Sequence, residues 1–509
     1  MLVSRRRFAA LAAMGLAGTR LTAARSRAKL IVLLIAEQFR SDYLDLYSNF
    51  LSAGGFRRLM DEGAYFPECQ MAASTFTSGG LATISTGAYP QLHGIVADSW
   101  YDRAAKKPVV ASWQALEATT LADKIAEADP ANRIYSLAFD LREAEMLVGG
   151  ARYSRFYMNS NGLYDALGPA GESAWLASFN QNLANSPEKT RDAPWYALGR
   201  KESAPPLRTL KYDPARPQDF LALYRASPFG QASQMTLARD IIVQEKLGQA
   251  LATDVLMVAL GSIGLLGYEV GSDSPLMREM ALHLDQEVAT LLTLMDKTLG
   301  LRKYALVFTS LHGAPRDPDG QRKMLAIPGE TVARTINQAL SARYDVRGRK
   351  KVYVERYIYP FLYLRLDALQ SAYIDLREAR VMAGRAALNV PGVVGYYTAD
   401  GDCSHSGAWL RRFQNSFHAV RSGDVMLAYG PDFIEDTGNG RGISYGSLYN
   451  YDSRVPLILF GDPFGAEAFD TQVESIDVAS TLARVAGSAW PSSATGRVLG
   501  EALSWAEEG

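Results

Sequence analysis

Continuous apolar runs of strand length recur along the chain. The first spans Lys29 to Ala36 and reads KLIVLLIA, and similar runs follow at 134–138, 254–261, 304–309 and 455–460. A strand that is apolar at every position, rather than at alternate ones, is typical of a sheet covered on both faces. We therefore predict that these runs form the strands of a buried, mostly parallel sheet.

Helical patterns lie between these runs, at 55–62, 235–252 and 274–299. Strands that alternate with helices are typical of βαβ units. The sequence therefore predicts an α/β fold with a doubly wound, mostly parallel sheet and helices on both of its faces. Because ligands of such sheets bind beyond the carboxyl ends of the strands, we look for chemistry in the loops that follow each strand.

Two stretches interrupt this alternation. Residues 150–230 are rich in Asn, Ser, Pro and Tyr, which indicates an insertion with loops. Residues 328–425 have a βαβ-like pattern of their own, with expected helices and strands near 332–342, 352–354, 359–366, 376–387 and 392–398. We predict that 328–425 forms an inserted α+β cap subdomain, and that 29–327 and 426–505 form the core.

The first 28 residues have the composition of an export signal. They carry six arginines and no acidic residue, and an apolar run from Phe8 to Gly18 follows the twin arginines. This pattern predicts a twin-arginine signal peptide and a bacterial periplasmic or secreted protein. The apolar run is shorter than the roughly 20 residues that span a bilayer, and no later window reaches that length, so we expect no transmembrane span in the mature chain.

Charge and composition narrow the partners. The chain has 53 basic and 54 acidic residues, but residues beyond 28 have a net charge of −7 once the six leader arginines are set aside. A mildly acidic protein lacks the basic surface that nucleic acid requires, so nucleic acid is excluded as a partner. With only 5 histidines, any multi-histidine metal site would have to use most of them. The 2 cysteines, Cys69 and Cys403, leave a disulfide open in an oxidising compartment.

Several motifs are similar to those of the alkaline phosphatase superfamily, in the same order, from about residue 29 to 490. They include IAEQFRSDYL, STFTSGGLATISTGAYPQLHG, TSLHGA and YNYDSRVPLILFG. The chain most closely resembles the phosphate-irrepressible alkaline phosphatase and nucleotide pyrophosphatase/phosphodiesterase branches. The resemblance implies two zinc ions held by three Asp and three His side chains, with a Thr or Ser between them that attacks phosphorus. Two such cations stabilise the attacking and the leaving oxygen together.

Carrying this pattern over gives an uneven set of residues. Thr77 stands at the position of the nucleophile. The positions of the metal ligands are occupied by Glu37, Gly264, Tyr268, Leu311, His312 and Arg454. Glycine and leucine side chains cannot bind zinc, and arginine does not give up its proton. The resemblance therefore leaves room for at most one metal ion, at Glu37 and His312. We otherwise expect no cofactor, because zinc sites normally need three good ligands.

The residues that would hold the phosphate also differ. The resemblance places Asp98 where relatives have Asn, Asp140 where they have Lys, and Arg142 where they keep Arg, while Leu81 replaces a His. Two added carboxylates and a lost ammonium should repel a phosphate dianion. One alternative is that Asp140 pairs with Arg454 and neutralises the former metal site.

Each of these residues also has a structural interpretation. Thr77 could cap a helix, as Ser and Thr commonly do. His312 could be a hydrogen-bonded structural histidine, and Glu37 could form an ion pair with Arg142 or Arg454. Bulky side chains at the other ligand positions could simply fill the volume of the metal.

Three hypotheses for function follow. The first is an exported pseudo-phosphatase that binds a small molecule or a periplasmic protein without turnover. The second is an active phosphoester hydrolase, or one acting on a related ester, with a rebuilt site in which Thr77 attacks beside a single metal on Glu37 and His312. The third is a metal-free transferase that uses Arg142 and Arg454 to neutralise an anion. We favour the first, because the ligand positions have changed while the surrounding motifs have not.

Other candidates carry less weight. The window 442–446 fits the G-x-S-x-G pattern of a serine hydrolase but lies in a Gly- and Asn-rich loop. The loop around His405 is a weak candidate for metal binding. If Asp273 or Asp452 reached the pocket, either would supply a further ligand and favour the second hypothesis.

Overall fold

The computed structural model describes residues 28–171, 173–200, 204–316, 325–345, 351–435 and 445–504. The expected signal peptide, residues 1–28, lies outside this part of the chain except for Ala28, as does most of the 442–446 window. Within the described ranges, no helix combines the length and the apolar character needed to cross a bilayer. Cys69 and Cys403 are both free thiols, so no disulfide joins them.

A ten-stranded sheet forms the centre of the molecule, with the strand order β19-β2-β18-β11-β1-β10-β5-β6-β7 and β20 paired to β2. β1 (Leu30–Ala36) pairs in parallel with both β10 (Asp254–Leu260) and β11 (Ala305–Ser310), and β5 (Ile134–Ala138) runs parallel to β10. β18 (Arg454–Gly461) is antiparallel to β11. The other strands of this sheet are β2 (Ala64–Gln70), β6 (Ser154–Met158), β7 (Tyr164–Leu167), β19 (Glu467–Ala468) and β20 (Val473–Glu474).

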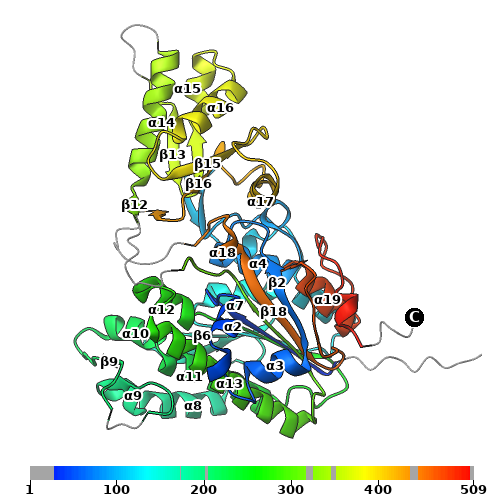
Figure 1. Ribbon diagram of the computed structural model, residues 1–509. Helices are drawn as coiled ribbons and strands as arrows, with labels where there is room; N and C mark the ends of the chain where they lie inside the picture. The colour runs from blue at the N-terminus through cyan, green and yellow to red at the C-terminus, as the bar shows by residue number, and fades with distance from the viewer. Residues whose placement is uncertain are drawn as a thin grey trace, which may run out of the picture.

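The predicted apolar runs are the central strands, and both of their faces are covered. In β1, Leu33 belongs to one hydrophobic cluster and the adjacent Leu34 to the other, and both are fully buried. One face packs against α4 (Thr77–Thr86), α6 (Leu121–Ala128), α7 (Leu141–Val148) and α19 (Asp477–Ala486). The other packs against α3 (Phe56–Glu62), α11 (Pro228–Gln244) and α13 (Pro275–Leu299) (Figure 1). The doubly wound α/β prediction is confirmed.

One predicted helix was misplaced. α11 begins at Pro228 and ends at Gln244, whereas the pattern predicted 235–252. The Ser227 hydroxyl accepts from the N–H of Gly230 and caps the start, and proline suits the first helical position. Lys246 and Gly248 adopt positive φ angles, 52° and 74°, which ends the helix. The stretch 150–230 contains short elements as well as loops, namely α8 (Ala174–Ala184), α9 (Pro187–Thr190), β8 (Ala193–Trp195), β9 (Arg208–Leu210) and α10 (Pro217–Arg225).

A second, four-stranded sheet stands apart from the large one, at the top of Figure 1. Its order is β13 (Val354–Ile358), β14 (Phe361–Leu364), β16 (Val425–Tyr429), β15 (Val393–Thr398). With α14 (Gly329–Tyr344), α15 (Leu366–Ser371) and α16 (Leu376–Ala387) it encloses its own hydrophobic core.

The prediction of a βαβ-like region was wrong. A βαβ unit joins parallel strands, whereas every strand pair in the small sheet is antiparallel. β13 and β14 are joined by a two-residue turn, Tyr359–Pro360, which makes them a hairpin. The predicted boundary at 425 falls at the first residue of β16, and the division into core and cap stays a prediction.

Further short elements connect these layers. They are α2 (Tyr43–Leu46), α5 (Pro90–His93), β3 (Ser99–Asp102), β4 (Lys107–Val110), α12 (Ser262–Val270), β12 (Leu325–Ile327), α17 (Ala408–Ser416), β17 (Phe433–Glu435) and α18 (Asn450–Ser453).

Candidate functional site

The predicted site residues come from one edge of the large sheet. Glu37 directly follows β1, and His312 lies two residues beyond the end of β11. Asp140 stands at the start of α7, just after β5. Because β18 is antiparallel to β11, its first residue, Arg454, also reaches this edge. The carboxyl ends of the parallel strands therefore meet where the doubly wound fold predicts a site.

Thr77, the first residue of α4, is bonded to Glu37. Its hydroxyl Oγ1 donates to Glu37 Oε1 at 2.7 Å. The N-cap of α4 is Phe76, and no side chain caps this helix, so the capping interpretation of Thr77 was wrong. The threonine hydroxyl and a carboxylate are thus within the distance of a nucleophile and its base.

Gly264 makes this contact possible. A Cβ atom added at Gly264 would lie 2.4 Å from Glu37 Oε2 and 2.6 Å from Glu37 Cδ, far inside van der Waals contact. Any side chain at 264, including the aspartate that the resemblance implies there, would displace the Glu37 carboxylate. The position of the Glu37 carboxylate therefore depends on the absence of a side chain at residue 264.

Tyr268, on α12, also points at Glu37. Its hydroxyl donates to Glu37 Oε1 at 3.3 Å. Burial, followed by the charge of Glu37, raises the pKa of Tyr268 well above its usual range, so the phenol keeps its proton. A protonated phenol that donates to a carboxylate fills this position as a hydrogen-bond donor rather than as an anionic ligand.

His312 is held by the scaffold. Its Nδ1 lies 2.8 Å from the carbonyl oxygen of Gly313, which suits an N–H donor, and its ring stacks on Tyr445 at 5.5 Å between centroids. Nε2 lies 4.0 Å from Glu37 Oε1 and has no hydrogen-bond partner in the described chain. Burial alone would lower the pKa of His312, but Glu37 and the buried Asp452 outweigh it and raise this pKa. The contact with Gly313 is what the structural interpretation of this histidine expects.

Arg454 turns away from the site. Its Nη2 lies 2.6 Å from Glu68 Oε1, and its Nε donates to the carbonyl of Pro67 at 3.1 Å. Both partners belong to β2, the strand that pairs with β18. The alternatives in which Arg454 pairs with Asp140 or with Glu37 were therefore wrong. The transferase hypothesis loses one of its two arginines for the same reason.

Leu311 closes the floor of the site. It is 2% exposed and packs over Gly80 of α4, where an added Cβ would lie 3.2 Å from Leu311 Cδ2. The space enclosed by Glu37, Thr77, Leu311 and their neighbours is about 10 Å³. That is close to the room taken by one water molecule, so this space has no room for a larger group.

The predicted phosphate-holding residues are engaged with one another and with the backbone. Asp98 Oδ1 accepts from the N–H of Ser78 at 2.8 Å, and its Oδ2 accepts from the Tyr445 hydroxyl at 3.0 Å. Asp140 pairs with Arg142 at 3.1 Å, not with Arg454. Burial would raise the pKa of Asp140, but the hydrogen bonds and charge of Arg142 more than offset it and lower this pKa.

A cavity of about 270 Å³ opens beside Thr77. Its wall includes two residues that the sequence did not single out, Glu143 and Tyr445. Burial, followed by the charges of Glu37 and Asp140, raises the pKa of Glu143 to about 8. Glu143 lies on α7, three residues after Asp140, and this helical spacing is the signal that could have identified it.

The residues present do not fit a pair of zinc ions. Among the residues that the structure describes, no three His, Cys, Asp or Glu side chains are grouped so that they could hold a metal. Asp452 is buried near His312 but does not line the cavity, and Asp273 pairs with Arg40 at 3.1 Å. The other histidines, His93, His283, His405 and His418, do not line it either.

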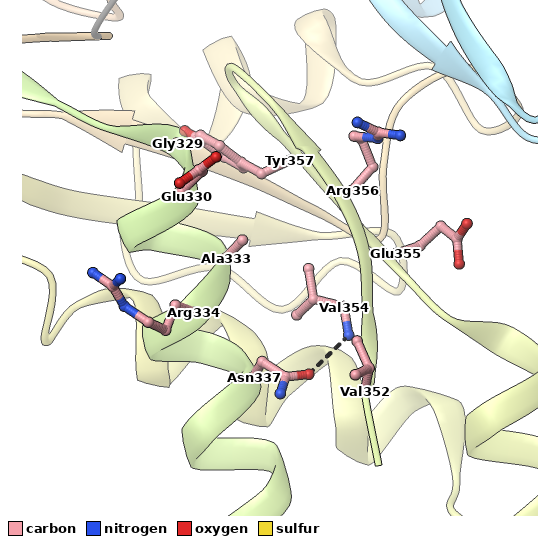
Figure 2. Close-up of a pocket in the computed structure, with 10 residues that line it drawn as sticks. All are labelled: Gly329, Glu330, Ala333, Arg334, Asn337, Val352, Val354, Glu355, Arg356 and Tyr357. Carbon is pink, nitrogen blue, oxygen red and sulfur yellow. Dashed lines mark hydrogen bonds between the residues drawn. The ribbon is translucent and has the colours of Figure 1, made fainter. Parts of the chain in front are cut away.

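A larger hollow, of about 390 Å³, lies between α14 and β13. Figure 2 shows Arg334 pointing away from the strand, and Glu355 and Arg356 on the side of the strand turned away from α14. Asn337 is used to hold the backbone of Val354 at 3.2 Å. Because its polar groups do not converge, this groove is a weaker candidate than the cavity beside Thr77.

Comparisons with known proteins agree with this fold. Residues 31–434 match the family described as Type I phosphodiesterase / nucleotide pyrophosphatase. The chain is 26% identical to alkaline phosphatase PhoK of a Sphingomonas species, covering 89% of this chain and 88% of that protein. It is 23% identical to alkaline phosphatase PafA of Elizabethkingia meningoseptica, covering 96% and 97%. A crystal structure of wild-type PafA superposes with a TM-score of 0.79 at 21% identity, covering 94% of this chain and 99% of that one, which shows the shared fold alone.

Proposed function

We propose that this chain, which belongs to the type I phosphodiesterase / nucleotide pyrophosphatase family within the alkaline phosphatase superfamily, is a pseudo-phosphatase. In this proposal the chain keeps the hydrolase fold and the pocket beside Thr77. It binds a small molecule or a periplasmic protein there and does not turn over phosphoesters.

The contact between Thr77 and Glu37 carries this proposal. In the family mechanism that the resemblance implies, metal ions activate the threonine hydroxyl. Here the hydroxyl donates to a carboxylate at 2.7 Å, and that carboxylate occupies the space above Gly264. A carboxylate is a much weaker base than an alkoxide, so this hydrogen bond alone leaves the threonine hydroxyl un-ionised and weakly nucleophilic. The same carboxylate also receives the Tyr268 hydroxyl, so the residues of the site satisfy one another.

The charge of the pocket supports the same conclusion. The wall contains the carboxylates of Glu37, Asp98 and Asp140 and the carboxyl group of Glu143, but only one guanidinium, that of Arg142. Arg142 is already paired with Asp140. A phosphate dianion entering this cavity would meet uncompensated negative charge, which raises the free energy of the bound state.

An active hydrolase is the second candidate, favoured by one observation. The 2.7 Å distance from Thr77 Oγ1 to Glu37 Oε1 is also that of a nucleophile to a general base. In that case Glu37 would take the hydroxyl proton as the oxygen attacks, and Tyr268 would orient the base.

Turnover by the purified chain separates the two candidates. Hydrolysis of p-nitrophenyl phosphate, bis(p-nitrophenyl) phosphate and p-nitrophenyl sulfate is measured with and without added zinc, for the wild type and for Thr77→Ala. The proposal predicts equal, background rates for both proteins. A wild-type rate that Thr77→Ala abolishes would establish the hydrolase instead, and Glu37→Gln would then test the base.

We also propose that the chain is exported to the periplasm or beyond, on the evidence of its first 28 residues. Replacing Arg6 and Arg7 together by lysine should leave the protein in the cytoplasm at its full, uncleaved mass. Fractionation followed by mass spectrometry measures this. Periplasmic delivery of the double variant would contradict twin-arginine export.

A further inference from the structure

The cavity beside Thr77 has an unusual balance of charge and apolar surface. It encloses about 270 Å³, close to the smallest sites that hold drug-sized ligands. Its apolar wall consists of the side chains of Leu81, Val110, Ala111, Met146 and Leu265. A ligand of this site must therefore be small and must present both a hydrocarbon surface and a charge complementary to carboxylates.

Glu37 has one carboxylate oxygen left over. Its Oε1 accepts from both Thr77 and Tyr268, whereas Oε2 has no hydrogen-bond partner among the described residues. The residue is only 9% exposed and lines the cavity. Because Glu37 lines the cavity, a donor supplied by a ligand can form a charge-assisted hydrogen bond with this carboxylate oxygen.

Glu143 is a second acidic side chain without a hydrogen-bond partner. It lines the same cavity, and it makes no hydrogen bond or ion pair with the part of the chain that the structure describes. Its pKa of about 8 arises from burial and then from the charges of Glu37, Asp140 and Asp98. A cation placed between these groups would offset the repulsion that, in addition to burial, keeps the proton on Glu143.

Two tyrosines complete the site. Tyr268 and Tyr445 both line the cavity, with ring centroids 5.3 Å apart and planes inclined by 44°. Aromatic faces attract cations, and a cation near both carboxylates and rings gains from each. The hydroxyls of Tyr268 and Tyr445 already donate to Glu37 and Asp98, so they are not available to donate to a phosphate.

We propose that this cavity binds a small organic cation, an ammonium group on a short apolar or aromatic body, with the ammonium directed at Glu37 Oε2 and Glu143. The inference rests on the proposed function, since it names the ligand class of a pocket that no longer turns over phosphate. It involves no covalent step. The former phosphatase pocket would thus have inverted its preference, from an anion to a cation.

Calorimetric titration at pH 7 with three probes of one shape tests this inference. The probes are benzylamine, benzyl alcohol and benzyl phosphate. We expect benzylamine to bind at least tenfold more tightly than benzyl alcohol, and benzyl phosphate not to bind. Tighter binding of benzyl phosphate or benzyl alcohol than of benzylamine, or no binding of benzylamine at all, would overturn the inference.

Isosteric variants locate the site. Asp98→Asn removes one negative charge, and Glu143→Gln removes a carboxyl group that a bound cation would cause to ionise. Each should weaken benzylamine about tenfold, which corresponds to about 1.4 kcal/mol. Asn at 98 can still accept from the Ser78 N–H, so the fold should be retained, and the melting temperature of each variant checks this. Glu467→Gln, on the exposed edge strand β19, is the matched control and should leave the affinity unchanged. Equal benzylamine affinity in the wild type and both pocket variants would contradict the assignment.

The result is separable from the test of the proposed function. Phosphoester turnover that depends on Thr77 would refute the pseudo-phosphatase whatever benzylamine does. A chain without turnover that binds benzyl phosphate in preference to benzylamine would leave the pseudo-phosphatase standing and refute only the cation.

Discussion

The two halves of the site differ in how their side chains are engaged. In the nucleophile half, Thr77, Glu37 and Asp98 are bonded to one another or to neighbouring groups at 2.7–3.0 Å. The other half, which we call the metal half, consists of positions that hold metal ligands in the family. There the side chains of Gly264 and Leu311 have no metal-ligating atom, and Arg454 pairs with Glu68. The comparison teaches that Thr77 and the acidic groups around it can be held in fixed contacts while the neighbouring positions carry side chains without metal-ligating atoms.

The largest expected effect concerns the scaffold beneath the nucleophile half. His93 is fully buried, its ring lies 3.1 Å from the Thr83 hydroxyl of α4, and it accepts from the N–H of Ile95. Burial lowers the pKa of His93 to about 3. The unfolded chain binds a proton at this residue below about pH 6.5, whereas the folded chain does not, so stability falls as the pH drops through this window.

Between about pH 7 and pH 4, His93 should therefore account for a loss of about 3 kcal/mol in the free energy of unfolding. Urea unfolding of the wild type and of His93→Gln at both pH values measures it, with the variant showing a smaller loss on acidification. If the free energy of unfolding falls by the same amount in both proteins on acidification, a neutral His93 does not stabilise the fold around α4.

The next effect tests the coupling between the halves. Gly264→Ala places a methyl group 2.4 Å from Glu37 Oε2 and should cost about 2 kcal/mol of stability. In a Glu37→Asp background the shorter acid leaves room, so the same change should cost less than about 1 kcal/mol.

Gly500→Ala is the control, because a Cβ there meets nothing within 4 Å. Chemical denaturation of the four proteins of this cycle and of the control gives the coupling energy. Equal costs of Gly264→Ala in both backgrounds would show that the residues at 37 and 264 are independent.

A smaller effect belongs to Glu143. Because its pKa in the folded chain is about 8, it holds a proton that the unfolded chain has released above about pH 4.5. Stability is therefore lost as the pH rises from about 4.5 to 8, by about 1 kcal/mol once partial exposure is allowed for. Glu143→Gln should be less sensitive over this range in thermal unfolding scans, and an unchanged pH profile would count against the raised pKa.

The smallest effect is expected at Arg454. The ion pair with Glu68 is 40% and 41% exposed, so Arg454→His should change stability by less than about 1 kcal/mol. It should also fail to create zinc binding, because 264 and 311 still supply no ligand. Equilibrium dialysis with zinc measures this, and tight binding by the variant would mean that a single replacement had disabled the metal half.

Much of the fold could be predicted because the central strands are buried on both faces. Continuous apolar runs such as LIVLLIA in β1 are easily recognised as buried strands. Because ligands of such sheets bind beyond the carboxyl ends of the strands, the position of the site follows. β13 was harder to place, because it reads VERYI and its adjacent charged residues, Glu355 and Arg356, interrupt the apolar pattern at the edge of the small sheet. The strands of the small sheet are short, and their apolar residues do not distinguish parallel from antiparallel pairing, so this sheet was assigned the wrong pairing.

The chemistry of the site could be predicted only in part. The identity of each residue was readable, but the direction of a long side chain depends on partners far away in the sequence. Arg454 is the clearest case, since Glu68 on the neighbouring strand attracts it away from the site. Glu143 was missed because a glutamate on an amphipathic helix usually faces water, and only the fold brings it beside Glu37.

The zinc content of the purified chain tests the central claim most directly. The protein is incubated with excess zinc, dialysed against metal-free buffer, and analysed by inductively coupled plasma mass spectrometry, with a zinc-loaded alkaline phosphatase as positive control. A site whose metal half is lost should retain well under one zinc ion per chain. Two tightly held zinc ions per chain would contradict this account.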